Sequence, residues 1–210
     1  MSFICTNGYE YVAAQWAIWR AGGIAVPLCN THPLPELEYI IQDSQSDVLL
    51  VHRRFEKFMK PLCDQMLLSA PKKKRILMLD DIMPRAEPSQ KHFEIIPADE
   101  SQRAMLIYTS GTTGKPKGVV FTHAMIKAQV TGLLKAWEWS SSDRILHVLP
   151  LHHVHGIINV LTCALWKGAT CEFMHFDAKN VWERFVEKKH AVSLFMAVPT
   201  IYGFSTFLRF

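Results

Sequence analysis

Long apolar runs are missing from this chain of 210 residues. The best candidate, residues 157–166, is about half as long as a membrane-spanning helix must be, and Lys167 follows it directly. The first residues carry no recognisable signal or transit peptide. We therefore expect no membrane span. A composition that is 49% hydrophobic predicts a folded domain with a sizeable core.

Cysteine pairs and charge of one sign are also scarce. The five cysteines are odd in number, and none of them forms a Cys-x-x-Cys pair. This pattern favours reduced thiols in an intracellular compartment or an organelle matrix, without structural zinc. The net charge of +4 is too small to indicate nucleic-acid binding. The basic residues 71–75 could bind a polyanion or a targeting receptor, but we interpret them as a solvated loop before a strand.

Short apolar segments alternate with segments of helical spacing along most of the chain. The expected strands are residues 2–6, 24–28, 47–52, 75–79, 104–108, 145–149, 169–174 and 192–198. The expected helices are residues 9–21, a helix opened by Pro33 and Pro35, residues 53–69, 122–137 with Thr122 as N-cap, 157–166, 178–189 and a helix from 199 onward. This alternation predicts the α/β class, with parallel sheets and helices on both faces.

Residues 80–102 interrupt the alternation, because they hold three prolines and many charges. We interpret residues 86–102 as a connecting loop. It would separate a first α/β subdomain at residues 1–85 from a second at residues 103–210.

The most informative stretch is residues 108–119, Tyr-Thr-Ser-Gly-Thr-Thr-Gly-Lys-Pro-Lys-Gly-Val. Its glycines let the backbone turn and approach a ligand closely, and Pro116 limits where Lys115 and Lys117 point. Backbone N–H groups, hydroxyl groups and cations together suit the oxygens of phosphate groups. The stretch therefore predicts a phosphate-binding loop; the alternative is a flexible surface loop between a strand and a helix.

Two better-known phosphate loops do not fit this stretch. The Walker A loop needs four residues between its glycines, whereas two residues separate Gly111 from Gly114. It also needs Ser or Thr after its lysine, and Lys115 is followed by proline. No Gly-x-Gly-x-x-Gly sequence of the dinucleotide-binding kind occurs here.

Residues 108–118 resemble the signature loop of the adenylate-forming (AMP-binding) enzymes, which include acyl-CoA synthetases, peptide-synthetase adenylation domains and luciferases. In that family the loop holds the β- and γ-phosphates of ATP, which leave as pyrophosphate. The resemblance implies that the two subdomains stack as part of the family's large N-terminal domain. The ATP-binding residues that it implies are Thr109, Ser110, Gly111, Thr112, Thr113, Gly114, Lys115, Pro116 and Lys117.

A second stretch, residues 149–156, reads Leu-Pro-Leu-His-His-Val-His-Gly. Its histidines could bind a metal or cap a strand at the surface, but no cysteine or carboxylate lies near in sequence, so we predict no metal site. Adenylate-forming enzymes carry a Pro-Leu-x-His-x-x-Gly segment after the signature loop. Matched by position, His153 is the family histidine that shapes the acyl pocket beside the adenylate, and it is our catalytic candidate.

His155 points to one group within this family, because the sequence His-Val-His-Gly at residues 153–156 resembles that of its malonyl-CoA synthetases. Their substrate carries a second carboxylate, to which an imidazole can donate a hydrogen bond or, when protonated, pair. A pocket for long fatty chains would favour an apolar residue there. We therefore assign His153, His155 and Gly156 to the substrate pocket and expect malonate or a similar short acid.

The resemblance implies an AMP-forming acid–thiol ligase that uses ATP, Mg²⁺ and CoA. It also implies a mitochondrial location, although the cytoplasm stays open because no transit peptide is visible. Three family parts are not found: a Tyr-Gly-x-Thr-Glu segment, the ribose-binding aspartate and the small C-terminal domain with its lysine. Residues 204–210 also depart from the family pattern. We expect a truncated piece that is inactive alone; the alternatives are a non-catalytic isoform that binds nucleotide or a partner chain, and a phosphate-binding kinase.

Overall fold

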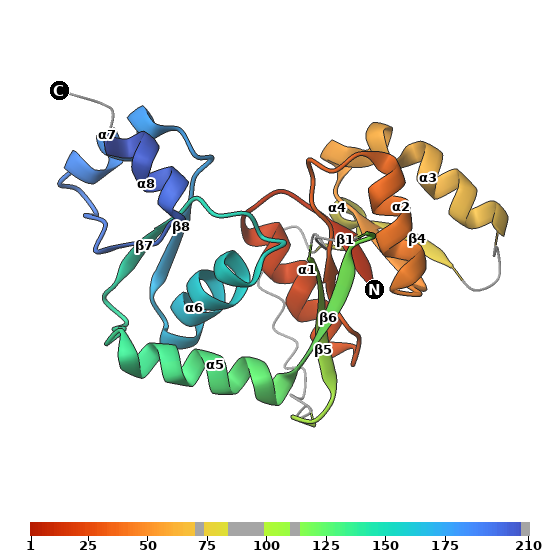
Figure 1. Ribbon diagram of the computed structural model, residues 1–210, viewed down its shortest axis with the longest axis horizontal. Helices are drawn as coiled ribbons and strands as arrows, with labels where there is room; N and C mark the ends of the chain where they lie inside the picture. Colours follow the sequence, from red (N-terminus) through yellow and green to blue (C-terminus); the bar gives the residue numbers. More distant parts are fainter. Residues whose placement is uncertain (70–73, 84–98, 110–113, 207–210) are drawn as a thin grey trace. The chain divides into compact units, whose positions relative to one another are not determined.

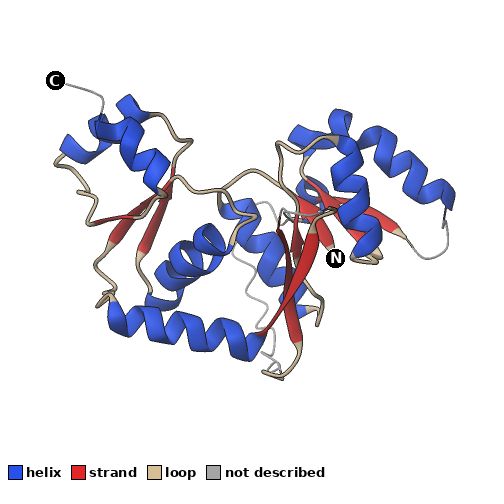
Figure 2. Ribbon diagram, viewed as in Figure 1, coloured by secondary structure: helices blue, strands red, loops and turns tan. Residues whose placement is uncertain are grey.

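The computed structural model describes residues 1–69, 74–83, 99–109 and 114–206. The chain forms two compact units, Met1–Ala124 and Met125–Phe210, which we call unit 1 and unit 2. Helices and strands alternate in both of them (Figure 2), as the α/β class requires.

Unit 1 is built on a four-stranded parallel sheet in the order β2-β1-β3-β4. Its strands are β1 (Ser2–Ile4), β2 (Val26–Pro27), β3 (Val48–Val51) and β4 (Arg75–Met78). They are connected through α1 (Tyr9–Arg20), α2 (Leu34–Asp43), and the 3-10 turn η1 (Arg53–Phe55) with α3 (Glu56–Ser69). The connection through α1 crosses the sheet in one direction, from β1 to β2, whereas the connections through α2 and α3 cross it in the other direction, from β2 to β3 and from β3 to β4. Right-handed connections therefore place α1 on one face and the other two helices on the second face (Figure 1).

Apolar side chains from both layers fill the core of unit 1. Ile4 and Leu49 come from the sheet, Leu37 and Ile41 from α2, and Met59 from α3, and all five are fully buried. Short continuous apolar strands are expected in a sheet that is covered on both faces. The helix expected at residues 53–69 is present as η1 and α3, and α3 continues through Pro61 from Glu56 to Ser69. The short helix α4 (Leu79–Ile82) follows β4.

An antiparallel hairpin of β5 (Arg103–Thr109) and β6 (Lys117–Thr122) completes unit 1. The Ala25 N–H donates to the carbonyl of Ala104, and the Leu106 N–H donates to the carbonyl of Ala25, each at 2.9 Å. These bonds join β5 to the chain just before β2. The hairpin therefore belongs to unit 1. The predicted connecting loop at residues 86–102 stays a prediction, since residues 86–98 lie outside the described residues.

Unit 2 contains a three-stranded parallel sheet in the order β8-β7-β9. Its strands are β7 (Arg144–His147), β8 (Thr170–Phe173) and β9 (Leu194–Phe195). Its helices are α5 (His123–Ala136), which begins in unit 1, the π-helix η2 (His155–Thr162), α6 (Cys163–Lys167), α7 (Ala178–Val186) and α8 (Pro199–Thr206). The crossovers again run in opposite directions, so α6 and α7 lie on opposite faces of the sheet (Figure 1).

The parallel sheets with helices on both faces confirm the predicted fold class. One local expectation is wrong: residues 117–122 form a strand antiparallel to β5, where we expected the loop to lead into a helix. The helix expected at residues 157–166 is present, as the π-helix η2 followed by α6. Among the described residues, no helix combines the length and the apolar content needed to cross a lipid bilayer.

Candidate functional site

The predicted phosphate loop closes the β5–β6 hairpin of unit 1. Thr109, the last residue of β5, pairs with Lys117, the first residue of β6, and its Oγ1 donates to the Lys117 carbonyl at 3.4 Å. Four predicted phosphate ligands, Ser110, Gly111, Thr112 and Thr113, lie outside the described residues. The loop therefore has antiparallel strands on both sides, which hold its two ends next to each other.

The described part of the loop is open to solvent. Gly114, Lys115 and Lys117 are exposed, and Pro116 is half-buried. Gly114 has φ +157°, a conformation that L side chains rarely adopt, although a Cβ there would meet no atom within 4 Å. Glycine is therefore needed at this position for its backbone conformation rather than for lack of space.

The predicted substrate-pocket residues lie in unit 2, on the loop after β7 and at the start of the π-helix η2. His153 is exposed on the loop, and its ring centroid lies 4.2 Å from that of His152. His155 is half-buried as the first residue of η2. Gly156 is buried, and a Cβ on it would lie 2.4 Å from the carbonyl oxygen of Pro150. Any side chain at residue 156 would force the loop away from the helix.

His147 is a buried residue that sequence reasoning did not single out. Its Nε2–H donates to the carbonyl of Gly156 at 2.9 Å, and the ring centroid of Phe173 lies 5.2 Å from its own. Because a carbonyl can only accept, the proton must be on Nε2 in the neutral ring. Burial lowers the pKa of His147, and His155 lowers it further. His147 is therefore a neutral donor that ties the end of β7 to the start of η2. The only signal for it in the sequence is a histidine within an apolar strand.

Acidification is expected to destabilise the chain through His147. The pKa of His147 is lower in the folded state, so the folded chain binds fewer protons at this residue than the unfolded chain does. Its contribution to the free energy of unfolding is therefore fully present above the unfolded pKa of about 6.5, and it is lost as the pH falls toward the folded pKa. His147→Gln keeps a donor but cannot titrate. We expect it to remove most of the decline in unfolding free energy between about pH 7 and pH 5, measured by urea denaturation.

The comparison of wild type with His147→Gln separates the effect of His147 from that of the other titrating groups. His123, whose pKa burial also lowers, contributes equally to wild type and variant. Hydrogen bonds lower the pKa of Glu172 and Asp143, so these carboxylates act only at more acidic pH. The exposed His175→Gln is the matched control and should leave the pH dependence unchanged. An equal decline in wild type and His147→Gln would show that His147 does not titrate on unfolding.

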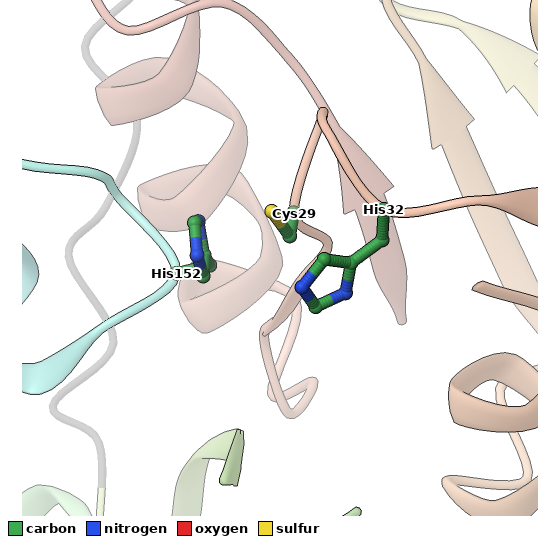
Figure 3. Close-up of side chains that lie close together, drawn as sticks. All are labelled: Cys29, His32 and His152. Atoms are coloured by element: carbon green, nitrogen blue, oxygen red, sulfur yellow. The ribbon is translucent and has the colours of Figure 1, made fainter. Parts of the chain in front are cut away.

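Figure 3 labels two potential metal ligands of unit 1, Cys29 and His32, on the loop after β2, and His152 on the loop of unit 2. Both residues of unit 1 contact neighbours within that unit. The Sγ of Cys29 lies 3.1 Å from Thr31 Oγ1, and Nδ1 of His32 lies 3.1 Å from Glu36 Oε1. The five cysteines are all free thiols in the structure, and we assign none of them to a metal.

The match to a known family defines the class of protein. Residues 2–205 match the AMP-binding enzyme family, and the chain belongs to this family of adenylate-forming enzymes. The mitochondrial malonate–CoA ligase ACSF3 of Homo sapiens is 46% identical, over 96% of this chain and 35% of the relative. The chain thus spans about a third of the length of these curated relatives, the ACSF3 of Homo sapiens and that of Xenopus laevis. The family predicted from residues 108–118 is confirmed.

Solved structures agree with this assignment. ATP-bound MatB from Rhodopseudomonas palustris has a TM-score of 0.80 at 24% identity, covering 97% of this chain and 40% of that one, and it supports the fold. The o-succinylbenzoate CoA synthetase MenE from Bacillus subtilis, in complex with its acyl-adenylate intermediate, has a TM-score of 0.77 at 26% identity. It covers 99% of this chain and 51% of MenE.

Proposed function

We propose that the protein that contains this chain is an AMP-forming acid–thiol ligase that converts malonate to malonyl-CoA. The observation that carries the proposal is the β5–β6 hairpin, which presents Gly114, Lys115 and Lys117 beside the rest of the signature loop in a chain of the AMP-binding family. The relatives named as malonate–CoA ligases support the choice of acid.

The proposed reaction has two steps. A malonate carboxylate oxygen attacks the α-phosphorus of ATP, and the bond between the α-phosphorus and the oxygen that bridges to the β-phosphate breaks. Malonyl-adenylate is formed, and pyrophosphate is released. The CoA thiol then attacks the acyl carbonyl and loses its proton, and AMP leaves. Both reactants of the first step are anions, so their positioning and the neutralisation of their charge must supply most of the catalysis.

The residues of the hairpin suit the leaving pyrophosphate. Lys115 and Lys117 are exposed cations at its loop end, and none of the ion pairs within the described part of the chain involves them. Their charge is therefore available to phosphate oxygens. From the sequence, Ser110, Gly111, Thr112 and Thr113 would add hydroxyl and N–H donors. Mg²⁺ would enter with ATP as part of the substrate and would offset the charge of its phosphates; we assign no residue of this chain to it.

The loop before η2 supports the proposed acid pocket. We propose that His153 lies beside the acyl group as it reacts, and that His155 donates a hydrogen bond to the second carboxylate of malonate. His147 and Gly156 would fix this loop, because His147 donates to the Gly156 carbonyl and the Pro150 carbonyl lies so close that only glycine fits at residue 156. A change at either would act on the pocket indirectly.

Product analysis tests the proposal. The longest natural protein that contains residues 1–210 is incubated with ATP, Mg²⁺, CoA and malonate, acetate or butyrate. We expect AMP, pyrophosphate and malonyl-CoA in equal amounts, with malonate the preferred acid. ADP as the nucleotide product would instead identify a kinase. Omitting CoA is the internal control, because adenylate formation should then stop after about one turnover.

We also propose a mitochondrial location for this protein, since the ACSF3 relatives that are 45–46% identical to it are named as mitochondrial. Malonate, ATP and CoA are the partners we propose, with no nucleic acid among them. Cell fractionation with an antibody against the chain checks the location, and recovery in the cytosol alone would contradict it.

A further inference from the structure

Tyr39, a residue of α2, contacts the loop end of the β5–β6 hairpin in two ways. Its hydroxyl, Tyr39 Oη, donates a hydrogen bond to the Pro116 carbonyl at 3.1 Å. The ammonium nitrogen of Lys115 lies over the Tyr39 ring, 5.1 Å from the ring centroid. Tyr39 is itself partly buried against the core of unit 1, so the position of its ring is set by the packing of α2.

A second tyrosine ties the loop end of the hairpin to the same helix. Tyr108, the residue before the end of β5, donates through its hydroxyl to Oδ2 of Asp43, the last residue of α2, at 2.6 Å. Burial and this bond raise the pKa of Tyr108, which keeps its hydroxyl protonated as the donor. The rings of Tyr39 and Tyr108 meet edge to face with centroids 6.5 Å apart. The end of β5 and the loop residues just before β6 are thereby both held by α2.

The contact with Lys115 has a specific chemical advantage. A carboxylate that held this lysine would neutralise it, whereas an aromatic face attracts the ammonium group and leaves its charge unpaired. A lysine side chain also loses much rotational freedom when it binds a phosphate, and a side chain that is already restrained loses less of it. An aromatic ring can therefore hold the lysine ready for phosphate without competing for its charge.

We propose that Tyr39 is a positioning residue for the ATP phosphates, which acts by holding Lys115 and the Pro116 backbone in the orientation that receives them. This inference rests on the proposed function of the hairpin. It assigns Tyr39 to ATP affinity, with no direct part in the attack on the α-phosphorus.

Two substitutions separate the ring from the hydroxyl. Tyr39→Leu removes both contacts, and we expect the KM for ATP to rise about fivefold with kcat unchanged within about twofold, because a loss of uniform binding raises KM alone. Tyr39→Phe keeps the ring under Lys115 and loses only the bond to Pro116, so the rise should be about twofold. The KM values for malonate and CoA should not change.

A double-mutant cycle with Lys115→Met tests whether Tyr39 acts through the lysine. In the Lys115→Met background, Tyr39→Leu should raise the KM for ATP by less than about twofold, because the contact with the lysine is already gone. Tyr9→Phe, at an exposed tyrosine of α1 in the same unit, is the matched control and should have no effect. Thermal unfolding of each variant checks that the fold is kept.

The outcomes distinguish the positioning role of Tyr39 from the phosphate-binding function of the hairpin. If Lys115→Met alone leaves the KM for ATP unchanged, the phosphate-binding role of the hairpin fails, and the inference fails with it. If Lys115→Met weakens ATP but Tyr39→Leu has no effect, or has the same effect in both backgrounds, only the positioning role of Tyr39 is overturned.

Discussion

Replacing Lys117 by alanine is expected to lower ATP-dependent turnover at least tenfold, which corresponds to about 1.4 kcal/mol of activation free energy. Lys117 is exposed where β6 begins, paired across the hairpin with Thr109. It would neutralise charge that develops on the leaving pyrophosphate, so its loss should reduce kcat as well as kcat/KM. Steady-state pyrophosphate release, with malonate and CoA saturating, measures the effect.

Gly114→Val should give a loss of similar size for a different reason. Valine is strained at φ +157°, so the loop backbone must shift and its N–H groups no longer meet the phosphates in the same way. Lys135→Ala and Gly132→Val, both in α5, are the matched controls: Lys135 is exposed, and Gly132 has open space without a positive φ. Activity within about twofold of wild type for both Lys117→Ala and Gly114→Val would contradict the phosphate assignment.

Replacing His155 by leucine is expected to change the choice of acid. The loss of a hydrogen bond to a charged group costs about 1.5–3 kcal/mol, which lowers kcat/KM for malonate about ten- to more than a hundredfold. Acetate and butyrate have no second carboxylate and should lose far less. His155 is half-buried at the first residue of η2, so leucine can be accommodated there without an unpaired polar group.

The measurement is kcat/KM for malonate, acetate and butyrate with wild type, His155→Leu and His175→Leu. His175 is exposed on the loop after β8, and its substitution should leave all three values unchanged. An equal loss for all three acids in His155→Leu would mean that His155 shapes the pocket without reading the second carboxylate. Unfolding curves are needed as well, since His155 adjoins the tightly packed Gly156.

Much of this fold could be predicted because its signals are local. The apolar residues of β3 and the helical spacing of Leu37, Ile40 and Ile41 in α2 are visible in a few residues of sequence. The proposed phosphate loop stands out for the same reason, because its glycines, hydroxyls and lysines lie within one short stretch. These features depend little on distant parts of the chain.

The features that were missed depend on contacts between distant residues. Residues 117–122 lack the alternation of apolar and polar residues that marks a half-buried strand, because Val119 and Val120 are adjacent and both are exposed. Their extended conformation comes from pairing with β5. The π-helix η2 begins where Gly156 packs on Pro150, which local spacing cannot reveal. The roles of His147 and Tyr39 also arise only in the fold; Tyr39 and Pro116, for example, are 77 positions apart.

The most direct test of the central claim follows one oxygen atom. If the protein forms malonyl-adenylate, an oxygen of the malonate carboxylate becomes bonded to the α-phosphorus and leaves with AMP when CoA attacks. The longest natural protein that contains this chain is incubated with malonate labelled with heavy oxygen, ATP, Mg²⁺ and CoA, and the nucleotide and phosphate products are separated for mass spectrometry. We predict one heavy oxygen in each AMP formed and none in pyrophosphate. Unlabelled AMP, or heavy oxygen in inorganic phosphate, would contradict attack at the α-phosphorus and with it the proposed function.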